Sequence, residues 1–464
     1  MQKYFYPRIT KFLLGAAIFS TFITVALVVF NYEAMLTHIN IVIDHAKYYN
    51  PTNNLAQQLS LNDILRRDLI EVVLGFSTSV FFWFAYFVRQ DFFDGKSLWE
   101  ESVGMSVIFA SSAFLVCYCS ILYDNNKDMD LIINAEKDLN HFKIKRIQIS
   151  QKVKETPPLF IPTGIYLQSI EFTNSNNCIL TAYIWQKYEN GFHDSLTRGF
   201  LLPEAQEAEI TENYRKKVGN TEIIGWTVKA TIREVFHFRD YPFDHQNFWL
   251  RLWHKDFDKN VILIPDIQAY TDYKPNKLPG IEKFIVLPSW YITHSFFGYK
   301  YNSYNTNFGI NDYVGLQNFP ELYYNVFIQR DFVSVFISDL VPIVMTIAIL
   351  FIALIVTYKP EETTDDVFKF NVMEIISLVA ALIFVVLLAH IELRSRIVTE
   401  TVVYIEYYYF LTYAAIFCVL GNYLILHKQY NIPFILAKNN YYPKILFLPL
   451  LTLFMLLLTI FVFY

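Results

Sequence analysis

Charged residues and glycine are both scarce in this chain, and the two shortages exclude several classes of protein. Charged residues make up 17% of the 464 residues and glycine occurs 14 times, whereas 54% of the residues are hydrophobic. A composition this apolar is unlike that of an ordinary soluble protein. The formal net charge of −5 argues against a nucleic-acid-binding protein, which would carry a basic surface. The low glycine content disfavours glycine-rich nucleotide-binding folds.

Cysteine is also rare, and the motifs of common enzymes are missing from the sequence. The four cysteines show no Cys-x-x-Cys or Cys/His spacing, so we predict neither a disulfide framework nor a metal site. The sequence contains no GxSxG, HExxH or phosphate-binding loop. We therefore expect no catalytic residues and no cofactor, and we do not expect an enzyme.

Long apolar runs are present instead, near both ends of the chain. They cover residues 12–30, 72–88, 103–123, 333–358, 370–393, 402–426 and 442–464. About 20 apolar residues cross a bilayer as a helix, so these runs predict seven spans. We interpret the first as an uncleaved anchor, with a signal peptide as the alternative. The lysines and arginines of the short loops favour a cytosolic N-terminus in the cell (inner) membrane, which places residues 124–331 on the extracellular or periplasmic side.

Segments rich in β-branched and aromatic residues occupy the polar middle of the chain. They cover residues 161–172, 178–188, 225–238, 247–253, 283–288, 290–301 and 321–330, and the first two read as a hairpin. Several short strands separated by polar turns predict a β-sandwich. The expected fold is a membrane α+β protein with four regions. These are three N-terminal spans (1–123), a helical or extended linker (124–157), the sandwich (158–331) and a four-helix transmembrane domain (332–464).

One motif in the strand region is specific. Tyr241-Pro242-Phe243-Asp244-x-Gln246 resembles the signature loop of the pentameric ligand-gated ion channels, also called Cys-loop or Pro-loop receptors. Other features occur in the same order as in that family: the segment 163–167, Ser289-Trp290, Arg330 and Pro342. The resemblance therefore covers roughly residues 158–464. Glu234 and Phe248 stand where eukaryotic members carry cysteines, which is similar to bacterial members. The three N-terminal spans are additional to the family pattern.

The resemblance implies a ligand-gated channel that assembles as a homopentamer in membrane lipid. It would pass small inorganic cations in response to a small molecule, protons or Ca²⁺. The residues implied in coupling the outer domain to the pore are Tyr241, Pro242, Phe243, Asp244, Gln246, Arg330 and Pro342, with Asp244 and Arg330 as a buried ion pair. The candidate ligand-binding residues are Trp290, Tyr299, Tyr301, Tyr304 and Phe308. For the tyrosines near residue 300, ordinary β-surface aromatics are the alternative.

The periodicity of residues 370–393 independently predicts a pore-lining face. Glu374, Ser377, Ala381, Phe384, Leu388 and Ile391 step by threes and fours, so they share one side of a helix. An apolar constriction between polar ends is typical of a hydrophobic gate. Glu374, together with the preceding acidic residues 361, 362, 365 and 366, favours cations. The alternative register is Leu378, Leu382, Val385, Ala389 and Glu392, and an ordinary bundle helix is the alternative to a pore.

Two further sets of acidic residues leave alternatives open. Asp339 lies inside an apolar run, where an ionisable group is a functional candidate unless its carboxylate reaches the headgroups. His390, Glu392 and Glu406 are its candidate partners or proton sensors. Asp256 and Asp258 can form either a Ca²⁺ site or a solvated turn. The principal alternative to a channel is a non-conducting membrane receptor that senses a ligand through its outer β-domain.

Overall fold

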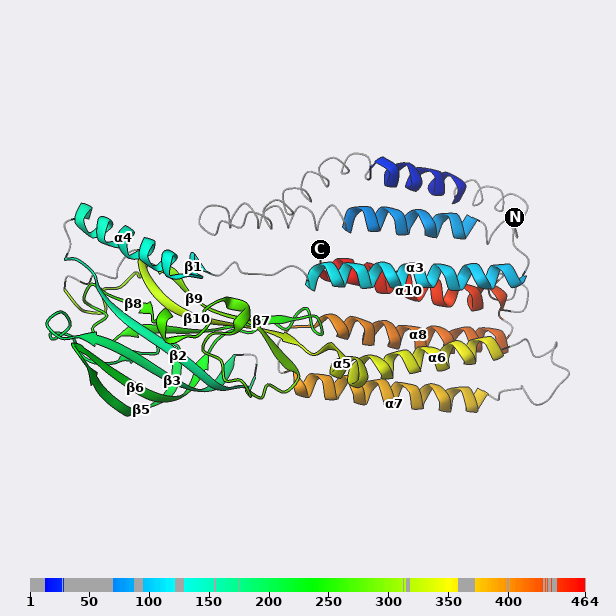
Figure 1. Cartoon of the computed structure of the whole chain (residues 1–464). Coiled ribbons are helices and arrows are strands. Elements are labelled where there is room, and N and C mark those ends of the chain that lie inside the picture. The colour runs from blue at the N-terminus through cyan, green and yellow to red at the C-terminus, as the bar shows by residue number, and fades with distance from the viewer. Residues whose placement is uncertain are drawn as a thin grey trace.

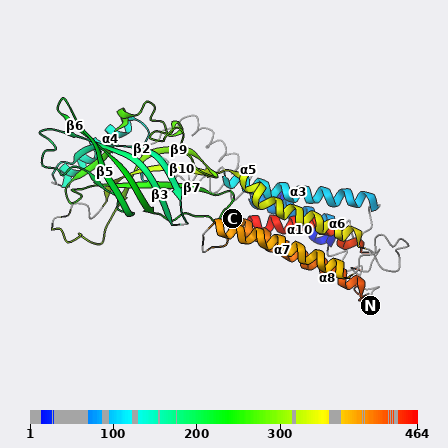
Figure 2. The ribbon, with the colours of Figure 1, turned by 90° about the horizontal axis from the view of Figure 1, so that it is seen from below.

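The computed structural model shows strands at one end of the molecule and long helices at the other (Figures 1 and 2). It describes residues 13–26, 28, 70–86, 95–121, 129–153, 156–174, 176–311, 313, 318–357, 372–397, 399, 401–428, 430, 432, 435 and 440–463. The acidic residues 361, 362, 365 and 366 and the first part of the expected linker lie outside these ranges.

Two five-stranded sheets make up the strand region. The first has the order β1-β9-β10-β7-β4, with β1 at Leu131–Ile133, β9 at Trp290–Asn302, β10 at Phe319–Arg330, β7 at His245–His254 and β4 at Phe200–Leu201. The second has the order β5-β6-β3-β2-β8, with β5 at Ala205–Val218, β6 at Thr221–Arg233, β3 at Asn177–Glu189, β2 at Leu159–Phe172 and β8 at Val261–Pro265. Only the β2–β8 pairing among these is parallel.

Alternating burial explains how the two sheets share a core. In β3, every second residue from Cys178 to Tyr188 is buried, and in β7 every second residue from Gln246 to His254 is buried. A period of two places these residues on one face of each strand. The apolar ones, including Leu180 and Leu250, belong to one continuous cluster of buried side chains. Both sheets therefore contribute to the same core.

The predicted hairpin is confirmed, because β2 pairs with β3 in antiparallel register from Thr163–Gln186 to Phe172–Cys178. Two strand predictions need correction. The strand expected over 225–238 ends at Arg233. The segment 283–288 forms no strand, because it lies between two turns closed by Ile285 N–H to Glu282 O and Trp290 N–H to Leu287 O. Its Phe284 and Val286 side chains are 78% and 77% exposed, so no neighbouring strand or core holds them.

Shorter helices flank or connect the strands. They are α4 (Glu136–Val153) and two 3₁₀ turns, η2 (Ile267–Ala269) and η3 (Pro275–Lys277). Helix α4 and strand β1 fill the region expected to be a helical or extended linker. Strand β1 pairs with β9, and α4 packs on the strands through Phe142, whose ring stacks on Tyr299 at 4.1 Å between centroids.

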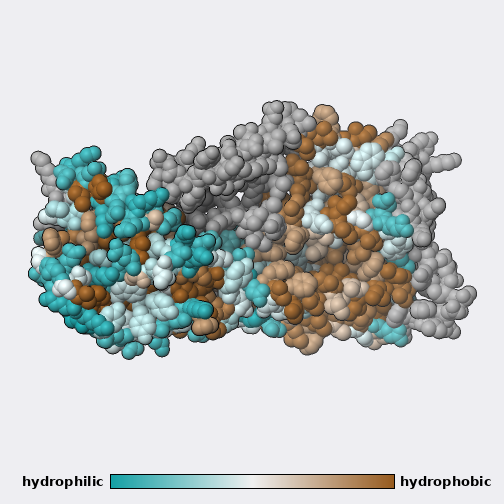
Figure 3. All heavy atoms as spheres, viewed as in Figure 1, coloured by the Kyte–Doolittle hydropathy of each residue, from teal (hydrophilic) through white to brown (hydrophobic). Residues whose placement is uncertain are grey.

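The helical region contains α3 (Gly95–Ile121), α5 (Phe332–Val335), α6 (Val341–Val356), α7 (Val372–Arg396), α8 (Tyr404–His427) and α10 (Tyr441–Phe463). Five helices are long and apolar enough to cross a membrane: Trp99–Cys117, Phe332–Val356, Met373–Arg396, Tyr404–His427 and Tyr441–Phe463. The first two predicted spans correspond to shorter apolar helices, Leu13–Ala26 and Ile70–Tyr86. Apolar surface covers the helices and polar surface the strands (Figure 3). The chain is therefore a multi-pass membrane protein.

A wider, π-helical turn joins α5 to α6 at Phe336–Leu340. Pro342 lies in the first turn of α6 and has no backbone N–H, so Ser338 lacks its usual helical donor. The N–H of Val341 instead reaches back five residues to the carbonyl of Phe336. This irregular turn carries Asp339, whose side chain is buried.

Helix α3 lies along α10 (Figure 1) and contacts both ends of the neighbouring helices. Near one end, the Ser102 hydroxyl donates to the Ile445 carbonyl at 2.6 Å. Near the other end, the Cys117 sulfur lies 3.4 Å from the Tyr404 hydroxyl of α8. The third N-terminal helix is therefore an integral part of the helical packing.

His254 is buried in the strand domain and is expected to make its stability depend on pH. Its Nδ1 accepts the Asp256 N–H at 3.1 Å, and its Nε2 lies 3.3 Å from the Tyr188 hydroxyl. Burial lowers the pKa of His254 to about 4 from its usual 6.5. The unfolded chain therefore binds this proton more readily between pH 6.5 and 4, so the free energy of unfolding should fall as the pH falls through that range. Across the full range, the free energy of unfolding should fall by roughly 3 kcal/mol.

We expect the unfolding temperature of the detergent-solubilised protein to drop more between pH 7.5 and 4.5 in the wild type than in His254→Gln. Glutamine keeps an acceptor but does not titrate. Tryptophan fluorescence provides the measurement, and His141→Gln on the exposed side of α4 is the matched control. Equal drops in wild type and His254→Gln would show that His254 does not govern this acid sensitivity.

Candidate functional site

The loop between β6 and β7 connects the strands to the helices. Two side chains close this loop, which has no disulfide to do so. The Gln246 amide accepts from the His237 N–H at 3.0 Å and donates to the His237 carbonyl at 2.7 Å. The Glu234 carboxylate accepts from the Trp249 N–H at 3.2 Å. Side-chain hydrogen bonds thus fasten both ends of the loop, which contains a cis peptide bond between Tyr241 and Pro242.

The ion pair between Asp244 and Arg330 is present and bidentate. Arg330 donates from Nε to Asp244 Oδ1 at 2.7 Å and from Nη2 to Oδ2 at 2.9 Å. Asp244 is 2% exposed. The Arg330 guanidinium also lies over the Trp290 ring, 4.0 Å from its centroid, and 4.6 Å from that of Tyr241. Planar pairing and stacking suit arginine in particular, so the end of β10 is held firmly against the loop.

Tyr241 extends this contact into the membrane-spanning helices. Its hydroxyl donates to Asp339 Oδ2 at 2.5 Å, and Arg396 at the end of α7 pairs with the other oxygen of the same carboxylate. Burial, together with the hydrogen bond to Asp339, raises the pKa of the Tyr241 phenol, so the hydroxyl remains a donor. A series of contacts therefore runs from Arg330 at the end of β10 to Tyr241 in the loop. From Tyr241 it continues to Asp339, just before α6, and to Arg396 at the end of α7.

This path corrects the expected partners of Asp339. Of the three candidate partners or proton sensors, His390 and Glu406 do not pair with Asp339. Instead, His390 Nε2 lies 3.1 Å from Glu406 Oε1, and Arg394 also pairs with Glu406. Residues on separate helices can lie at a similar depth in the membrane and still point in different directions. Their positions in the sequence do not reveal this.

Apolar and backbone contacts reinforce the junction. The Phe243 ring stacks on Phe332 of α5 with centroids 5.4 Å apart and lies 6.1 Å from the Tyr404 ring. The Tyr404 N–H donates to the Arg239 carbonyl at 2.8 Å, and Arg239 donates to the carbonyl of Val462 at 2.6 Å. The loop thus contacts α5, α8 and α10 at the same time.

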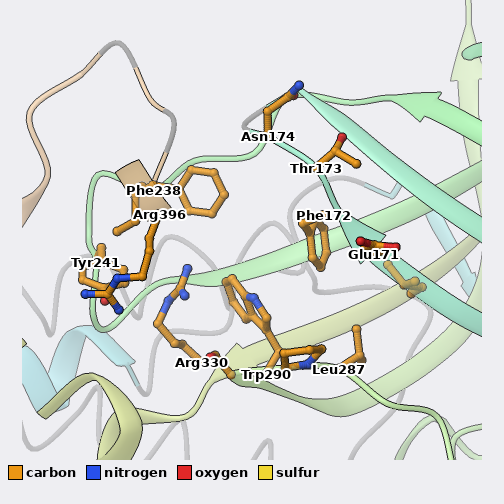
Figure 4. A pocket seen from close by; sticks show the side chains of 14 residues that line it. Glu171, Phe172, Thr173, Asn174, Phe238, Tyr241, Leu287, Trp290, Arg330 and Arg396 are labelled. Atoms are coloured by element: carbon orange, nitrogen blue, oxygen red, sulfur yellow. The ribbon is translucent and has the colours of Figure 1, made fainter. Parts of the chain in front are cut away.

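A cleft of about 330 Å³ lies beside the ion pair. Figure 4 shows Arg330 between Tyr241 and Trp290, with Phe172 and Asn174 contributed by the β2–β3 hairpin. Phe172 approaches Trp290 at 5.9 Å between ring centroids. The hairpin therefore borders the junction through an aromatic contact, and its Glu171 also lines the cleft.

The proposed pore face of α7 points away from the rest of the chain. Its members Glu374, Ser377, Ala381, Phe384, Leu388 and Ile391 are all exposed. The opposite side packs inward, with Ile375, Val379, Leu382, Val386 and Leu393 buried. Because Leu382 belongs to the alternative register, that register does not form one exposed face. Of the two registers, only the one that contains Phe384 is exposed at every position.

The five candidate ligand-binding residues do not form one site. Trp290 lies at the junction with Arg330. Tyr299 is completely buried, and its hydroxyl donates to the Leu263 carbonyl at 3.0 Å, so its assignment to a ligand cage is wrong. Tyr301 is half-buried, and its N–H donates to Asp130 beside β1. Only Tyr304 and Phe308 lie together, with ring centroids 5.5 Å apart.

Those two rings belong to an aromatic cluster that sequence reasoning missed. Its other members are Trp253, Phe257 and Tyr313, with neighbouring centroids between 5.4 and 6.0 Å apart. Arg251 extends over Trp253 and pairs with the two acids Glu204 and Glu321. Burial raises the pKa of the Glu204 carboxyl. The alternation of NFWLRLW predicts that strand, but not its convergence with the distant Glu321.

The two aspartates of the 255–260 turn do not gather into a metal site. Asp256 accepts from the Thr197 N–H at 2.9 Å and from Lys259 Nζ at 3.0 Å. Within the described ranges, no group of three or more histidine, cysteine, aspartate or glutamate side chains is placed to hold a metal ion.

No family model and no curated protein matches this chain.

Proposed function

We propose that the chain is a ligand-gated, cation-selective channel in which five copies surround a central pore. In this arrangement the two sheets form an extracellular or periplasmic β-sandwich. Helices α5–α6, α7, α8 and α10 form the transmembrane bundle, and α7 lines the pore. The observation that carries the proposal is the exposed face of α7, which is mechanically connected to the strand domain through Arg396.

The exposed face fits a pore better than a surface turned to lipid. It begins with Glu374, continues through Ser377 and then becomes apolar at Phe384 and Leu388. A carboxylate is costly in hydrocarbon but suited to a water-filled passage. The apolar part supplies a constriction that closes by dewetting.

The junction supplies a route from ligand to gate. Movement of β10 displaces Arg330, which is paired with Asp244 beside Tyr241. Tyr241 and Arg396 share the Asp339 carboxylate, so the same movement reaches the end of α7. Rigid charge-assisted hydrogen bonds suit this role because they are strongly directional. The cluster around Tyr304 and Phe308 is the ligand site that this proposal favours, since aromatic faces and excess carboxylate attract cations.

The test of this function is ion flux in liposomes that contain the purified full chain. Small amines, Ca²⁺ and acid are applied in turn to the side that carries the strand domain. The proposal requires that at least one of them opens a cation-selective flux. Binding without any flux would favour the non-conducting receptor.

Glu374→Gln should weaken cation selectivity. Five carboxylates at a narrow mouth concentrate cations, and glutamine keeps the shape while removing the charge. In asymmetric KCl, the reversal potential of the variant should move toward zero. Glu392→Gln, which removes an acid from outside the proposed face, is the matched control. An unchanged reversal potential in Glu374→Gln would place that residue outside the ion path.

A further inference from the structure

The cleft of about 330 Å³ at the junction has both aromatic and charged side chains in its lining. In Figure 4, the side chains of Phe172, Phe238 and Trp290 lie around this space, and Arg330 lines it as well. The volume exceeds the ~150 Å³ of a cavity known to hold benzene, so a substituted aromatic ring has room here. The cleft is distinct from the aromatic cluster around Tyr304 and Phe308, which contributes no residue to its lining.

Arg330 has hydrogen-bond donors that the ion pair does not use. Its Nε and Nη2 hold the two oxygens of Asp244. No described residue accepts a hydrogen bond from Nη1, and this atom is not sealed inside the protein. A guanidinium carries two N–H groups on each terminal nitrogen in one fixed plane. Because Arg330 lines the cleft, the N–H groups of Nη1 are available to a molecule inside it.

The charges around the cleft favour an uncharged ligand. The Arg330 guanidinium is paired with Asp244, and that of Arg396 is paired with Asp339. An anion would gain little from guanidinium groups that are already neutralised, and a cation would be repelled by them. Glu171 also lines the cleft, but it is exposed and attracts cations only weakly. Since either ion loses hydration on entry, a neutral hydrogen-bond acceptor suits the cleft best.

From these observations we propose that the cleft binds an uncharged aromatic molecule whose carbonyl oxygen accepts a hydrogen bond from Arg330 Nη1. The bond has a charged donor, which makes it stronger than a bond between neutral groups, and the pair with Asp244 stays intact. The ring of the ligand packs against Phe172 and Phe238, because aromatic rings favour edge-to-face and offset contacts. This proposal concerns binding alone and does not depend on whether the chain conducts ions.

The test uses competitors of nearly the same shape. A diazirine derivative of benzamide labels the full chain in liposomes, and mass spectrometry locates the labelled residues. Benzamide is neutral, benzoate is an anion and benzamidine is a cation. The label should fall on residues 170–174 and 287–290, and benzamide should displace it at a lower concentration than either ion. Thiobenzamide, whose sulfur is a weak acceptor, should require roughly tenfold more than benzamide, as expected for one hydrogen bond from a charged donor.

A double variant identifies the donor. Asp244→Leu combined with Arg330→Met removes Nη1 without leaving a buried charge unpaired, so benzamide and thiobenzamide should become equally effective. Glu212→Leu combined with Arg215→Met, the same changes at an exposed pair, is the matched control and should keep the tenfold difference.

Three results with the wild type would overturn the proposal. They are equal displacement by benzamide and thiobenzamide, stronger displacement by either ion, and labelling of the cluster around Tyr304 and Phe308 in place of the cleft. These results decide the question even if the double variant fails to fold.

Discussion

Phe384→Ser should give a channel that conducts ions without any stimulus. Phe384 is 60% exposed on the free face of α7, and Leu388, one turn further, is 50% exposed. Five such rings around a narrow passage keep it dry, and ions do not cross a dry segment at low cost. Serine makes the constriction both wider and wettable. The measurement is basal current in planar bilayers at matched amounts of protein, with the expected result a large rise over wild type.

Two neighbouring substitutions separate gating from damage to the fold. Val385→Ser replaces another exposed apolar side chain, which is 49% exposed but lies outside the proposed pore face. It should leave basal current close to that of the wild type. Val386→Ser places a hydroxyl on the buried side of α7 and should lower stability without opening the pore. A leak in Val385→Ser but not in Phe384→Ser would instead assign the pore to the neighbouring register.

Asp244→Ala should destabilise the protein severely and abolish activation. The substitution leaves the Arg330 guanidinium without its carboxylate in a cleft where the arginine side chain is only 10% exposed. Breaking a buried pair from one side costs roughly 3–5 kcal/mol. We expect a lower unfolding temperature, poor assembly and no response to any effector that opens the wild type. Glu212→Ala is the control, because its pair with Arg215 is exposed and should be worth at most about 1 kcal/mol.

A double variant distinguishes loss of stability from loss of coupling. Asp244→Leu combined with Arg330→Met removes both charges, and replacing a buried pair with apolar side chains is often neutral in stability. The double variant should regain most of the unfolding temperature but remain unresponsive. If it responds normally, the pair has a structural role and does not carry the movement from the strands to α7.

Among the strands that were predicted correctly, β3 and β7 bury a single face, whereas β10 is buried on both faces. Along β3 and β7, burial alternates with the pleat. Strand β5 was missed because nearly all of its residues are exposed and it therefore needs no apolar pattern. The segment 283–288 has the composition of a strand, but that composition forms a strand only where a partner is available.

At the junction, too, the sequence pointed to individual residues but not to the contacts between distant ones. The motif identified Tyr241 and Asp244, and the apolar run identified Asp339 as unusual. Neither revealed that the Tyr241 hydroxyl reaches Asp339, which lies 98 residues away in the sequence. Only the packing of the loop on the helices brings them together. For the same reason, the aromatic cluster around Tyr304 depends on Trp253 and Phe257 from a different strand and turn.

Unitary current is the most direct test of the channel proposal. Purified full-length chain is incorporated into a planar bilayer with a KCl gradient, and single openings are recorded in the presence of each candidate effector. The account predicts discrete openings of uniform amplitude with a reversal potential near that of K⁺. It also predicts that Phe384→Ser shows the same unitary selectivity without effector. Absence of discrete openings in both the wild type and Phe384→Ser, from protein that is folded and assembled, would contradict the account.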